Sequence, residues 1–155
     1  MKVAIIGAGS IVFCKTLLLD IVQTPGLEQT EFALMAPSRR HTPQVEAFAR
    51  RLFAANGLPA QVHVTTSQQD ALRGADFVIA TFQIGGLAAY EADYDIPMRY
   101  GVDQCIGDSL GPGGVFRAQR VIPVAVRLAE EMTTLCPGAT LLNYVNPMAP
   151  VCWAL

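Results

Sequence analysis

The chain has few charges and no block of either sign. Only 15% of its 155 residues are charged, and 11 Lys and Arg against 13 Asp and Glu give a formal net charge of −2. Because nucleic-acid-binding proteins carry a basic patch or stripe, that class is excluded. Apolar stretches also fall short of the roughly 18 consecutive residues that a membrane-spanning helix needs. The first residues lead into a short strand-like run without the features of a secretory signal. The sequence therefore predicts a cytoplasmic protein that binds neither nucleic acid nor membrane.

Closely spaced cysteines are also missing. The four cysteines, Cys14, Cys105, Cys136 and Cys152, stand far apart without a CxxC motif. Neither a disulfide framework nor a zinc knuckle is therefore indicated. We expect most of these residues to be buried reduced thiols, because free cysteine is among the most buried residue types.

Short apolar runs alternate with stretches of helical period. The runs suited to buried strands are residues 3–6, 32–35, 62–65, 77–81 and 140–144. The stretches with helical spacing are residues 11–22, 42–56 and 120–135. This alternation is typical of a parallel sheet covered by crossover helices. We predict an α/β fold, a Rossmann-like doubly wound parallel sheet that forms one domain over residues 1–155.

Residues 87–114 do not fit the alternation. They mix a helix-like stretch with several aspartates and a run of glycines, and we interpret them as a loop-rich segment on the substrate side. After residue 144 the chain reaches Leu155 at the expected start of another helix. Since doubly wound sheets commonly reach six strands, we expect this fold to be truncated and a further C-terminal domain to lie outside these residues.

Two glycines follow the first predicted strand and open the first predicted helix. The sequence GAGS at residues 7–10 places them where a main chain turns tightly and approaches a pyrophosphate at a helix N-terminus. Val12 replaces the third glycine of the usual fingerprint. The position between strand and helix favours a dinucleotide site over a purely structural turn. The predicted cofactor-binding residues of this loop are Gly7, Ala8, Gly9, Ser10 and Ile11.

The acidic residue that binds the ribose hydroxyls of NAD is missing at the end of the second predicted strand. Ala36 stands there, followed by Ser38, Arg39 and Arg40. In one interpretation, ribose recognition is weakened and the arginines belong to a solvated face. In the other, Ser38, Arg39 and Arg40 accept a 2′-phosphate, and the cofactor is NADP rather than NAD.

Two further motifs follow predicted strands, at the edge where open α/β sheets bind ligands. Gln83, Gly85 and Gly86 come after the fourth strand and either flank the riboses of the cofactor or form a ligand-free turn. Asn146 follows the fifth strand, where Pro147 restricts it to an extended conformation. It is a candidate for binding a substrate hydroxyl, or else part of a plain Asn-Pro turn.

Together these motifs resemble those of glycoside hydrolase family four, most closely its α-galactosidases. The longest match comprises GVDQ at residues 101–104 and GDSLGPGGVFRAQR at residues 107–120, followed by Ile122 and Pro123. Residues 7–10, 75–86 and 143–149 resemble the family's other N-terminal motifs. The resemblance covers essentially the whole of this chain but only the N-terminal part of the family's sequence.

This resemblance implies a glycosidase that uses NAD and a divalent metal, usually manganese, on an α-galactoside or a related sugar. In such a reaction the cofactor takes a hydride from C3 of the sugar, and the resulting ketone acidifies the C2 proton. A base removes that proton, the group on C1 leaves, water adds, and the hydride returns. The metal polarises the ketone as a Lewis acid.

The resemblance assigns substrate-side residues only where the motifs match. Asn146 corresponds to the family's substrate-binding Asn, and Asp103, Arg117 and Arg120 correspond to positions near the sugar or structuring its site. The family's metal-binding Cys and His and its proposed base lie beyond Leu155. We therefore expect no metal ligand and no catalytic base in this chain, and no activity from the 155 residues alone.

Three residues that commonly bind metals are interpreted as structural. Cys152 is expected as a buried thiol in the helix that follows Met148. His41 and His63 fall on a helix start and on the third predicted strand, away from the ligand edge.

Two other functions stay open. A 2-hydroxyacid dehydrogenase, of the lactate and malate dehydrogenase kind, shares the strand order and an Asn after a late strand, although the loop at residues 107–114 argues against it. A dinucleotide-binding remnant without catalysis is favoured by Ala36 and by the short chain. We also expect a homo-oligomer, because a truncated sheet leaves apolar surface uncovered.

Overall fold

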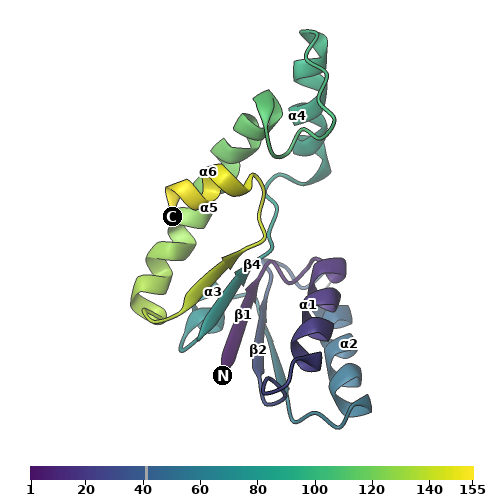
Figure 1. Ribbon diagram of the computed structural model, residues 1–155, viewed down its shortest axis with the longest axis vertical. Helices are drawn as coiled ribbons and strands as arrows, with labels where there is room; N and C mark the ends of the chain where they lie inside the picture. The colour runs from purple at the N-terminus through teal and green to yellow at the C-terminus, as the bar shows by residue number, and fades with distance from the viewer. Residues whose placement is uncertain (41) are drawn as a thin grey trace. The chain divides into compact units, whose positions relative to one another are not determined.

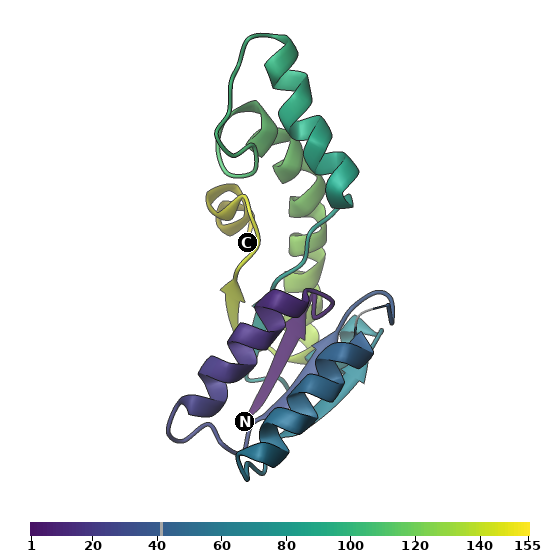
Figure 2. The ribbon, with the colours of Figure 1, turned by 90° about the vertical axis from the view of Figure 1, so that its right-hand side faces the viewer.

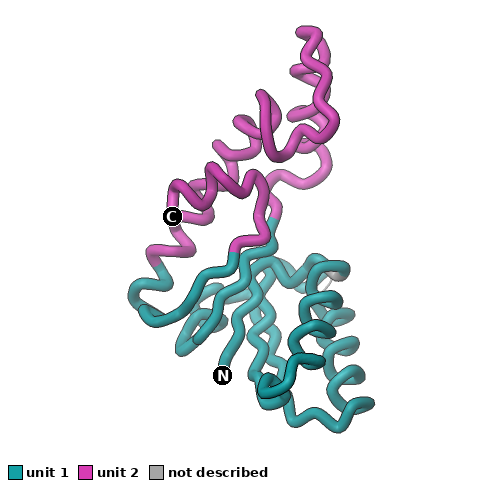
Figure 3. The backbone as a smooth tube through the Cα atoms, in the orientation of Figure 1, with its two compact units in different colours: residues 1–82, 131–142 teal, residues 83–130, 143–155 magenta. Residues whose placement is uncertain are grey.

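A computed structural model of the chain describes every residue except residue 41, and for Ile11 it describes the backbone alone. The chain forms two compact units (Figure 3). Unit 1 comprises Met1–Phe82 and Glu131–Leu142, and unit 2 comprises Gln83–Glu130 and Asn143–Leu155. The domain predicted over residues 1–155 thus consists of two parts, each with its own packing.

Five short strands of the described chain form one sheet in the order β3-β2-β1-β4-β5 (Figure 1). They are β1 (Lys2–Ile6), β2 (Glu31–Met35), β3 (Gln61–Thr65), β4 (Phe77–Ala80) and β5 (Thr140–Asn143). β1 pairs in parallel with β2 and with β4, so that Ile5 lies between Leu34 and Ile79. β2 also pairs in parallel with β3. This order confirms the predicted Rossmann-like sheet, since a parallel sheet that grows outward on both sides of β1 is the doubly wound arrangement.

Helices follow the strands along the described chain. They are α1 (Ile11–Gln23), α2 (Thr42–Ala55), α3 (Gln68–Leu72), α4 (Gly86–Arg99), α5 (Gly111–Leu135) and α6 (Met148–Ala154). α1 and α2 lie side by side in unit 1, as Figures 1 and 2 both show. α1 and α2 end within one residue of the predicted ends, where Pro25-Gly26 and Asn56-Gly57 interrupt the helical pattern.

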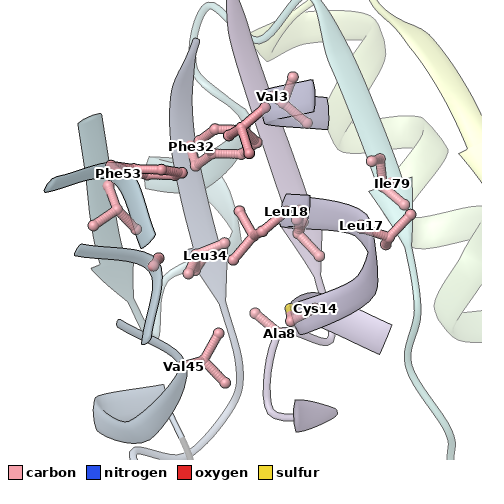
Figure 4. Packing of buried hydrophobic residues seen from close by; sticks show 14 residues of the cluster. Val3, Ala8, Cys14, Leu17, Leu18, Phe32, Leu34, Val45, Phe53 and Ile79 are labelled. Atoms are coloured by element: carbon pink, nitrogen blue, oxygen red, sulfur yellow. The ribbon is translucent and has the colours of Figure 1, made fainter. Parts of the chain in front are cut away.

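The hydrophobic core of unit 1 lies between the sheet and the helices α1 and α2 (Figure 4). Because alternate residues of a strand point to the same face, Val3 and Ile5 of β1 join Phe32 and Leu34 of β2 in this core. The helices contribute Cys14, Leu17, Leu18, Val45, Ala49 and Phe53. Ala4 and Ile6 of β1 are buried too, so residues 3–6 are covered on both faces of the sheet. This double burial explains why residues 3–6 form a continuous apolar run in the sequence.

Residues 87–114 contain much more helix than predicted. α4 covers the first half of this segment, and α5 already begins at Gly111, well before the predicted start at residue 120. Only residues 100–110 lack helical structure. The interpretation of the whole segment as loop-rich is therefore wrong, because its glycines and one of its aspartates serve the packing of two helices.

The glycines allow α5 to begin in contact with the main chain of α4. A Cβ atom on Gly113 would lie 2.6 Å from the carbonyl oxygens of both Asp93 and Gly107. The N–H of Gly113 donates to Oε1 of the buried Gln104 (3.0 Å), and Nε2 of Gln104 donates to the carbonyl oxygen of Asp93 (3.2 Å). Close approach of two backbones, rather than flexibility, therefore explains this glycine.

A buried ion pair supplies the second link between α4 and α5. The side chain of Asp93 in α4 is 2% exposed and accepts hydrogen bonds from both Nη atoms of Arg120 in α5. Arg120 Nη1 also donates to the carbonyl oxygen of Phe116 (3.2 Å). The Nε atom of Arg120 is buried without a partner among the described residues. The guanidinium of Arg120 is thus engaged in holding unit 2 together.

The cysteines divide into two buried and two exposed residues. Cys14 and Cys136 are buried, whereas Cys105 and Cys152 are exposed, so the expectation that most of the cysteines are buried is wrong. The prediction for Cys152 was correct for its helix but wrong for its burial. Among the residues of α6, Val151 faces inward, and the next residue therefore points to the surface.

The buried thiols are expected to resist alkylation. Burial raises the pKa of Cys14 to about 12 and also raises the pKa of Cys136. Since the thiolate is the reactive form, iodoacetamide at about pH 8 should modify Cys105 and Cys152 of the native protein at least about tenfold faster than the buried pair. Peptide mass spectrometry after timed quenching measures the four rates, with urea-unfolded protein as the control. Equal rates in the native protein would contradict this burial.

The same shift weakens the fold in alkali. The unfolded thiol of Cys14 ionises near its ordinary pKa of 9.0, and the folded thiol only near 12. Between these values the unfolded state binds fewer protons than the folded state, so the stabilisation that is present below pH 9 is lost as the pH rises towards 12.

Candidate functional site

The loop between β1 and α1 is fixed by backbone hydrogen bonds to β2. The N–H groups of Gly7 and Ala8 both donate to the carbonyl oxygen of Met35, at 2.9 and 2.8 Å. The N–H of Ser10 donates to the carbonyl oxygen of Gly7 (3.1 Å), and Cys14 N–H donates to the carbonyl oxygen of Ser10 (3.0 Å). The loop is therefore a defined turn that leads directly into the first turn of α1.

Gly7 is required by the fold itself. Its φ of +102° is a conformation that L side chains rarely adopt, and a Cβ atom there would lie 2.6 Å from the backbone nitrogen of Phe82. The same Cβ would lie 2.7 Å from the carbonyl carbon of Thr81. The turn after β1 thus passes against the end of β4, as the first glycine of a dinucleotide fingerprint requires.

The fold, in contrast, does not require a glycine at position 9. A Cβ atom there would meet only the Cβ of Ala36, at an ordinary contact distance of 3.7 Å, and its φ is not positive. A glycine at this position therefore leaves the main chain without a covering side chain. This is the role of the second glycine of the fingerprint, whose missing side chain lets a pyrophosphate approach.

The first turn of α1 fits the same ligand. Ser10 is the N-cap of the helix, and its side chain makes no capping hydrogen bond. The first N–H groups of any helix lack intrahelical partners, and together with the helix dipole they favour an anion. Val12, in the place of the third glycine, is 75% exposed, so its side chain does not crowd the sheet. The residues present therefore fit a dinucleotide, and the contacts of Gly9, Ser10 and Ile11 with its diphosphate stay a prediction.

The end of β2 lacks a carboxylate, as the sequence indicates. Ala36 is buried, and its N–H donates to the carbonyl oxygen of Thr65 (3.3 Å). Ser38, Arg39 and Arg40 follow as exposed residues. Position 36 faces Gly9, so an acidic residue there would stand beside the main chain of Gly9, whereas this protein has a methyl group at that place.

The glycine loop after β4 begins unit 2. Gly85 has a φ of +95° and is the N-cap of α4, and Gly86 also has a positive φ of +64°. Gln83 Nε2 lies 3.4 Å from the carbonyl oxygen of Gly86, at the long end of hydrogen-bond range. The backbone conformations explain both glycines. The cofactor contacts of Gln83, Gly85 and Gly86 stay a prediction.

A cluster of polar side chains in unit 2 brings together two of the predicted substrate-side residues. Asp108 Oδ2 accepts hydrogen bonds from Arg117 Nη1 (3.2 Å) and from Asn146 Nδ2 (3.1 Å). Arg117 Nε donates to the carbonyl oxygen of Asn146 (3.2 Å), and Ser109 Oγ donates to Asp108 Oδ1 (3.0 Å). The side chains of Arg117 and Asp108 are only 11% and 16% exposed. We call these four residues, Asp108, Ser109, Arg117 and Asn146, the Asp108 cluster.

Local structure holds Asn146 in this cluster. Asn143 ends β5, and its Oδ1 accepts the N–H of the buried Val145 (2.9 Å), which turns the chain out of the strand. The predicted site residue Asp103 is exposed, and no described residue bonds to it. The sequence reasoning missed Asp108, although it lies inside the longest quoted motif, because neither spacing nor periodicity distinguishes it from other loop aspartates.

Over the described chain, which omits residue 41, no three His, Cys, Asp or Glu residues come together in a way that could hold a metal ion. His63 lies exposed in β3, and His41 lies outside the described residues. The described residues therefore do not fit a metal site of their own. Within the same residues, no helix is long and apolar enough to cross a membrane.

Comparison with known sequences decides the family. The sequence model described as "Family 4 glycosyl hydrolase" matches residues 2–155. The chain belongs to the family 4 glycosyl hydrolases. The family 4 chain is 45% identical over 154 residues to an alpha-galactosidase of Rhizobium meliloti (strain 1021), and 36% identical over 155 residues to an alpha-galactosidase of Bacillus subtilis (strain 168). Both matches include 99% of this chain but only 31% and 36% of the relatives, so the chain spans about a third of their length.

Solved structures agree with the fold and with the family. A 6-phospho-beta glucosidase of Thermotoga maritima, solved with manganese, NAD+ and glucose-6-phosphate, superposes with a TM-score of 0.79 at 28% identity. That match covers 95% of this chain and 34% of the other. A lactate dehydrogenase of Eimeria maxima superposes with a TM-score of 0.67 at 16% identity. That match covers 99% of this chain and 38% of the dehydrogenase chain. At that identity the likeness shows the fold alone, the dehydrogenase-like Rossmann fold that the sequence predicts.

Proposed function

We propose that this chain is the nucleotide-binding part of an NAD- and divalent-metal-dependent glycosidase of the α-galactosidase type. Membership in family 4 supports glycoside hydrolysis, and the 45% identical alpha-galactosidase supports an α-galactoside as the substrate. The Thermotoga maritima relative, solved with NAD+ and manganese, supports the cofactor and the metal. The reaction proposed is oxidation at C3 of the sugar, elimination of the group on C1, addition of water and reduction.

The chain's own residues have two tasks in this reaction. The bare main chain at Gly9 and the first turn of α1 hold the diphosphate of the dinucleotide. Asn146 binds a sugar hydroxyl, assisted by Arg117 and Asp108. When bound, the dinucleotide supplies a hydride acceptor, which is chemistry that no side chain offers. We propose that the residues of this chain supply neither the catalytic base nor the metal ligands.

The observation that carries this proposal is the loop at residues 7–10, in which the fold requires a glycine at position 7 but leaves room for a side chain at position 9. Calorimetric titration with NAD and NADP tests dinucleotide binding. An assay with melibiose or a nitrophenyl α-galactoside, with dinucleotide, manganese and thiol present, tests hydrolysis. We expect a dinucleotide to bind the 155 residues without turnover. Robust turnover by these residues alone would show that the essential groups are present after all.

Two other functions give different results in the same tests. A 2-hydroxyacid dehydrogenase would reduce NAD in the presence of malate or lactate, which the absorbance of the nicotinamide would report. A non-catalytic dinucleotide-binding protein would bind cofactor in every form of the chain and never act on a sugar. Family membership favours the glycosidase over both.

The choice between NAD and NADP depends on the end of β2. Arg39 and Arg40 are exposed and bond to no other described residue, so their charges are available to a 2′-phosphate. NADP binding tighter than NAD would support this role, and NAD binding about tenfold tighter would contradict it.

Replacing Ala36 tests the same subsite directly. Ala36→Asp restores a carboxylate that accepts the ribose hydroxyls and repels a 2′-phosphate. We expect the ratio of NAD to NADP affinity to rise at least about tenfold, measured by calorimetry. Arg73→Ala, an exposed arginine that precedes the amino end of β4, is the matched control and should leave the ratio unchanged. An unaltered ratio in Ala36→Asp would place the ribose elsewhere.

Two further expectations belong to the proposal. A homo-oligomer is supported by large exposed apolar side chains such as Trp153, Leu110 and Val12, which are 93%, 81% and 75% exposed. A cytoplasmic location stays a prediction from the sequence.

A further inference from the structure

Asp108 is the centre of the Asp108 cluster. Its carboxylate accepts three side-chain hydrogen bonds, two at Oδ2 from Arg117 and Asn146 and one at Oδ1 from Ser109. Arg117 closes a ring, because it bonds both to Asp108 and to the main chain of Asn146. The side chain of Asp108 is 16% exposed, so water competes little for these bonds.

The chemistry of a carboxylate fixes the direction of the Asn146 amide. An ionised carboxylate only accepts hydrogen bonds, and Asp108 is paired with the permanent charge of Arg117. The atom of Asn146 that lies 3.1 Å from Asp108 must therefore be the donor Nδ2. The acceptor Oδ1 then lies on the other branch of the amide. A neutral partner at position 108 would remove this preference, since it could either donate or accept.

We propose that Asp108 is a positioning residue that orients Asn146, so that Asn146 presents its carbonyl oxygen to a sugar hydroxyl. The contact with a sugar rests on the proposed function, whereas the orientation of the Asn146 amide does not. Arg117 supports the same arrangement by fixing the main chain of Asn146 and the charge of Asp108. A hydroxyl that donates to Oδ1 of Asn146 is held with its oxygen lone pairs free, which suits a hydroxyl that also faces a cation or loses its proton.

The orientation is tested on the 155-residue chain without any sugar. In ¹⁵N-labelled protein, the side-chain amide protons of Asn146 should be protected from solvent exchange and shifted by their carboxylate partner. Asp108→Asn should remove the protection and move both signals. Asp95→Asn makes the same chemical change on the exposed surface of α4 and should leave them in place. Unchanged Asn146 signals in folded Asp108→Asn would overturn the proposal.

Arg117→Gln serves as the second variant if Asp108→Asn does not fold. It leaves the bond between Asp108 and Asn146 in place, so the side-chain signals of Asn146 should stay protected while the local backbone signals move. Loss of side-chain protection in Arg117→Gln would show that Arg117, and not Asp108, orients the amide, and would also overturn the proposal.

The consequence for the sugar is tested in the active enzyme that carries these residues. Asp108→Asn should lower kcat/KM for the α-galactoside roughly tenfold or more and leave dinucleotide affinity unchanged, because a hydrogen bond to a charged group is lost. Since Asp108 acts through Asn146, the double variant Asp108→Asn with Asn146→Ala should have almost the same kcat/KM as Asn146→Ala alone. Additive losses would contradict the positioning role. Absence of both turnover and dinucleotide binding in the unmodified enzyme would instead contradict the proposed function, and the amide test would still decide the orientation.

Discussion

Gly7→Ala is expected to lower the free energy of unfolding by about 3 kcal/mol or more. The new methyl group would lie 2.6 Å from the nitrogen of Phe82, and the φ of +102° would be strained with any side chain. Strained backbone and overpacking each cost roughly 1–3 kcal/mol. Thermal unfolding followed by circular dichroism measures the loss. A variant as stable as the unmodified protein would show that the turn after β1 does not pass against β4 as described.

Gly9→Ala provides the matched comparison. Its methyl group has room, since the nearest atom lies 3.7 Å away, so stability should change by less than about 1 kcal/mol. Dinucleotide affinity should nevertheless fall at least about tenfold, because the methyl group stands where the diphosphate approaches. We therefore expect Gly7→Ala to lower stability and Gly9→Ala to lower dinucleotide affinity. If Gly9→Ala bound the dinucleotide normally, the diphosphate would have to lie elsewhere.

Asp93→Ala is expected to have the other large effect. It leaves the guanidinium of Arg120 without its carboxylate partner, in a place where Nε already lacks one among the described residues. Removing one partner of a fully buried ion pair typically costs about 3–5 kcal/mol, and because the remaining Arg120 side chain is 30% exposed we expect a loss at or below the lower end of this range. Hydrogen exchange of the amides in α4 and α5 should accelerate while the sheet of unit 1 stays protected. Thermal unfolding and exchange mass spectrometry measure the two effects.

A surface ion pair of the same chain serves as the control for Asp93→Ala. Glu46 and Arg50 lie one turn apart on α2, with side chains 33% and 60% exposed. Glu46→Ala should change stability by no more than about 0.5 kcal/mol, because exposed pairs contribute little. Equal losses from Glu46→Ala and Asp93→Ala would contradict the structural role of the buried pair.

The strands β1, β2 and β4 were predictable because burial on both faces leaves a continuous apolar run in the sequence. After Lys2, β1 consists of apolar residues that pair with apolar residues of β2 and β4. The role of Gly7 was predictable because a sharp turn between a strand and a helix favours glycine. α3 was not predicted. Its signal was present, since Ser67 accepts the N–H of Asp70 (3.2 Å) as an N-cap does, but five residues carry too little periodicity.

The structure of unit 2 could not be predicted in the same way. Gly113 looks like a loop residue in the sequence. A glycine is required there because the carbonyl oxygens of Asp93 and Gly107, in other segments of the chain, leave no room for a Cβ atom. Asp93 looks like a surface residue in the sequence, but it is buried as the hydrogen-bond partner of Arg120, which lies 27 residues further along the chain. Asp108 depends in the same way on Arg117 and Asn146. Long-range polar contacts leave no local pattern, so these roles become visible only in three dimensions.

The most direct test of the account is a ¹⁵N-¹H correlation spectrum of the chain titrated with NAD or NADP. We predict saturable shifts of the backbone amides of Gly9, Ser10 and Val12, because their N–H groups lie at the bare main chain and first turn that should hold the diphosphate. The amides of β3 should not move. A spectrum unchanged by either dinucleotide, or shifts confined to residues far from this loop, would contradict the account.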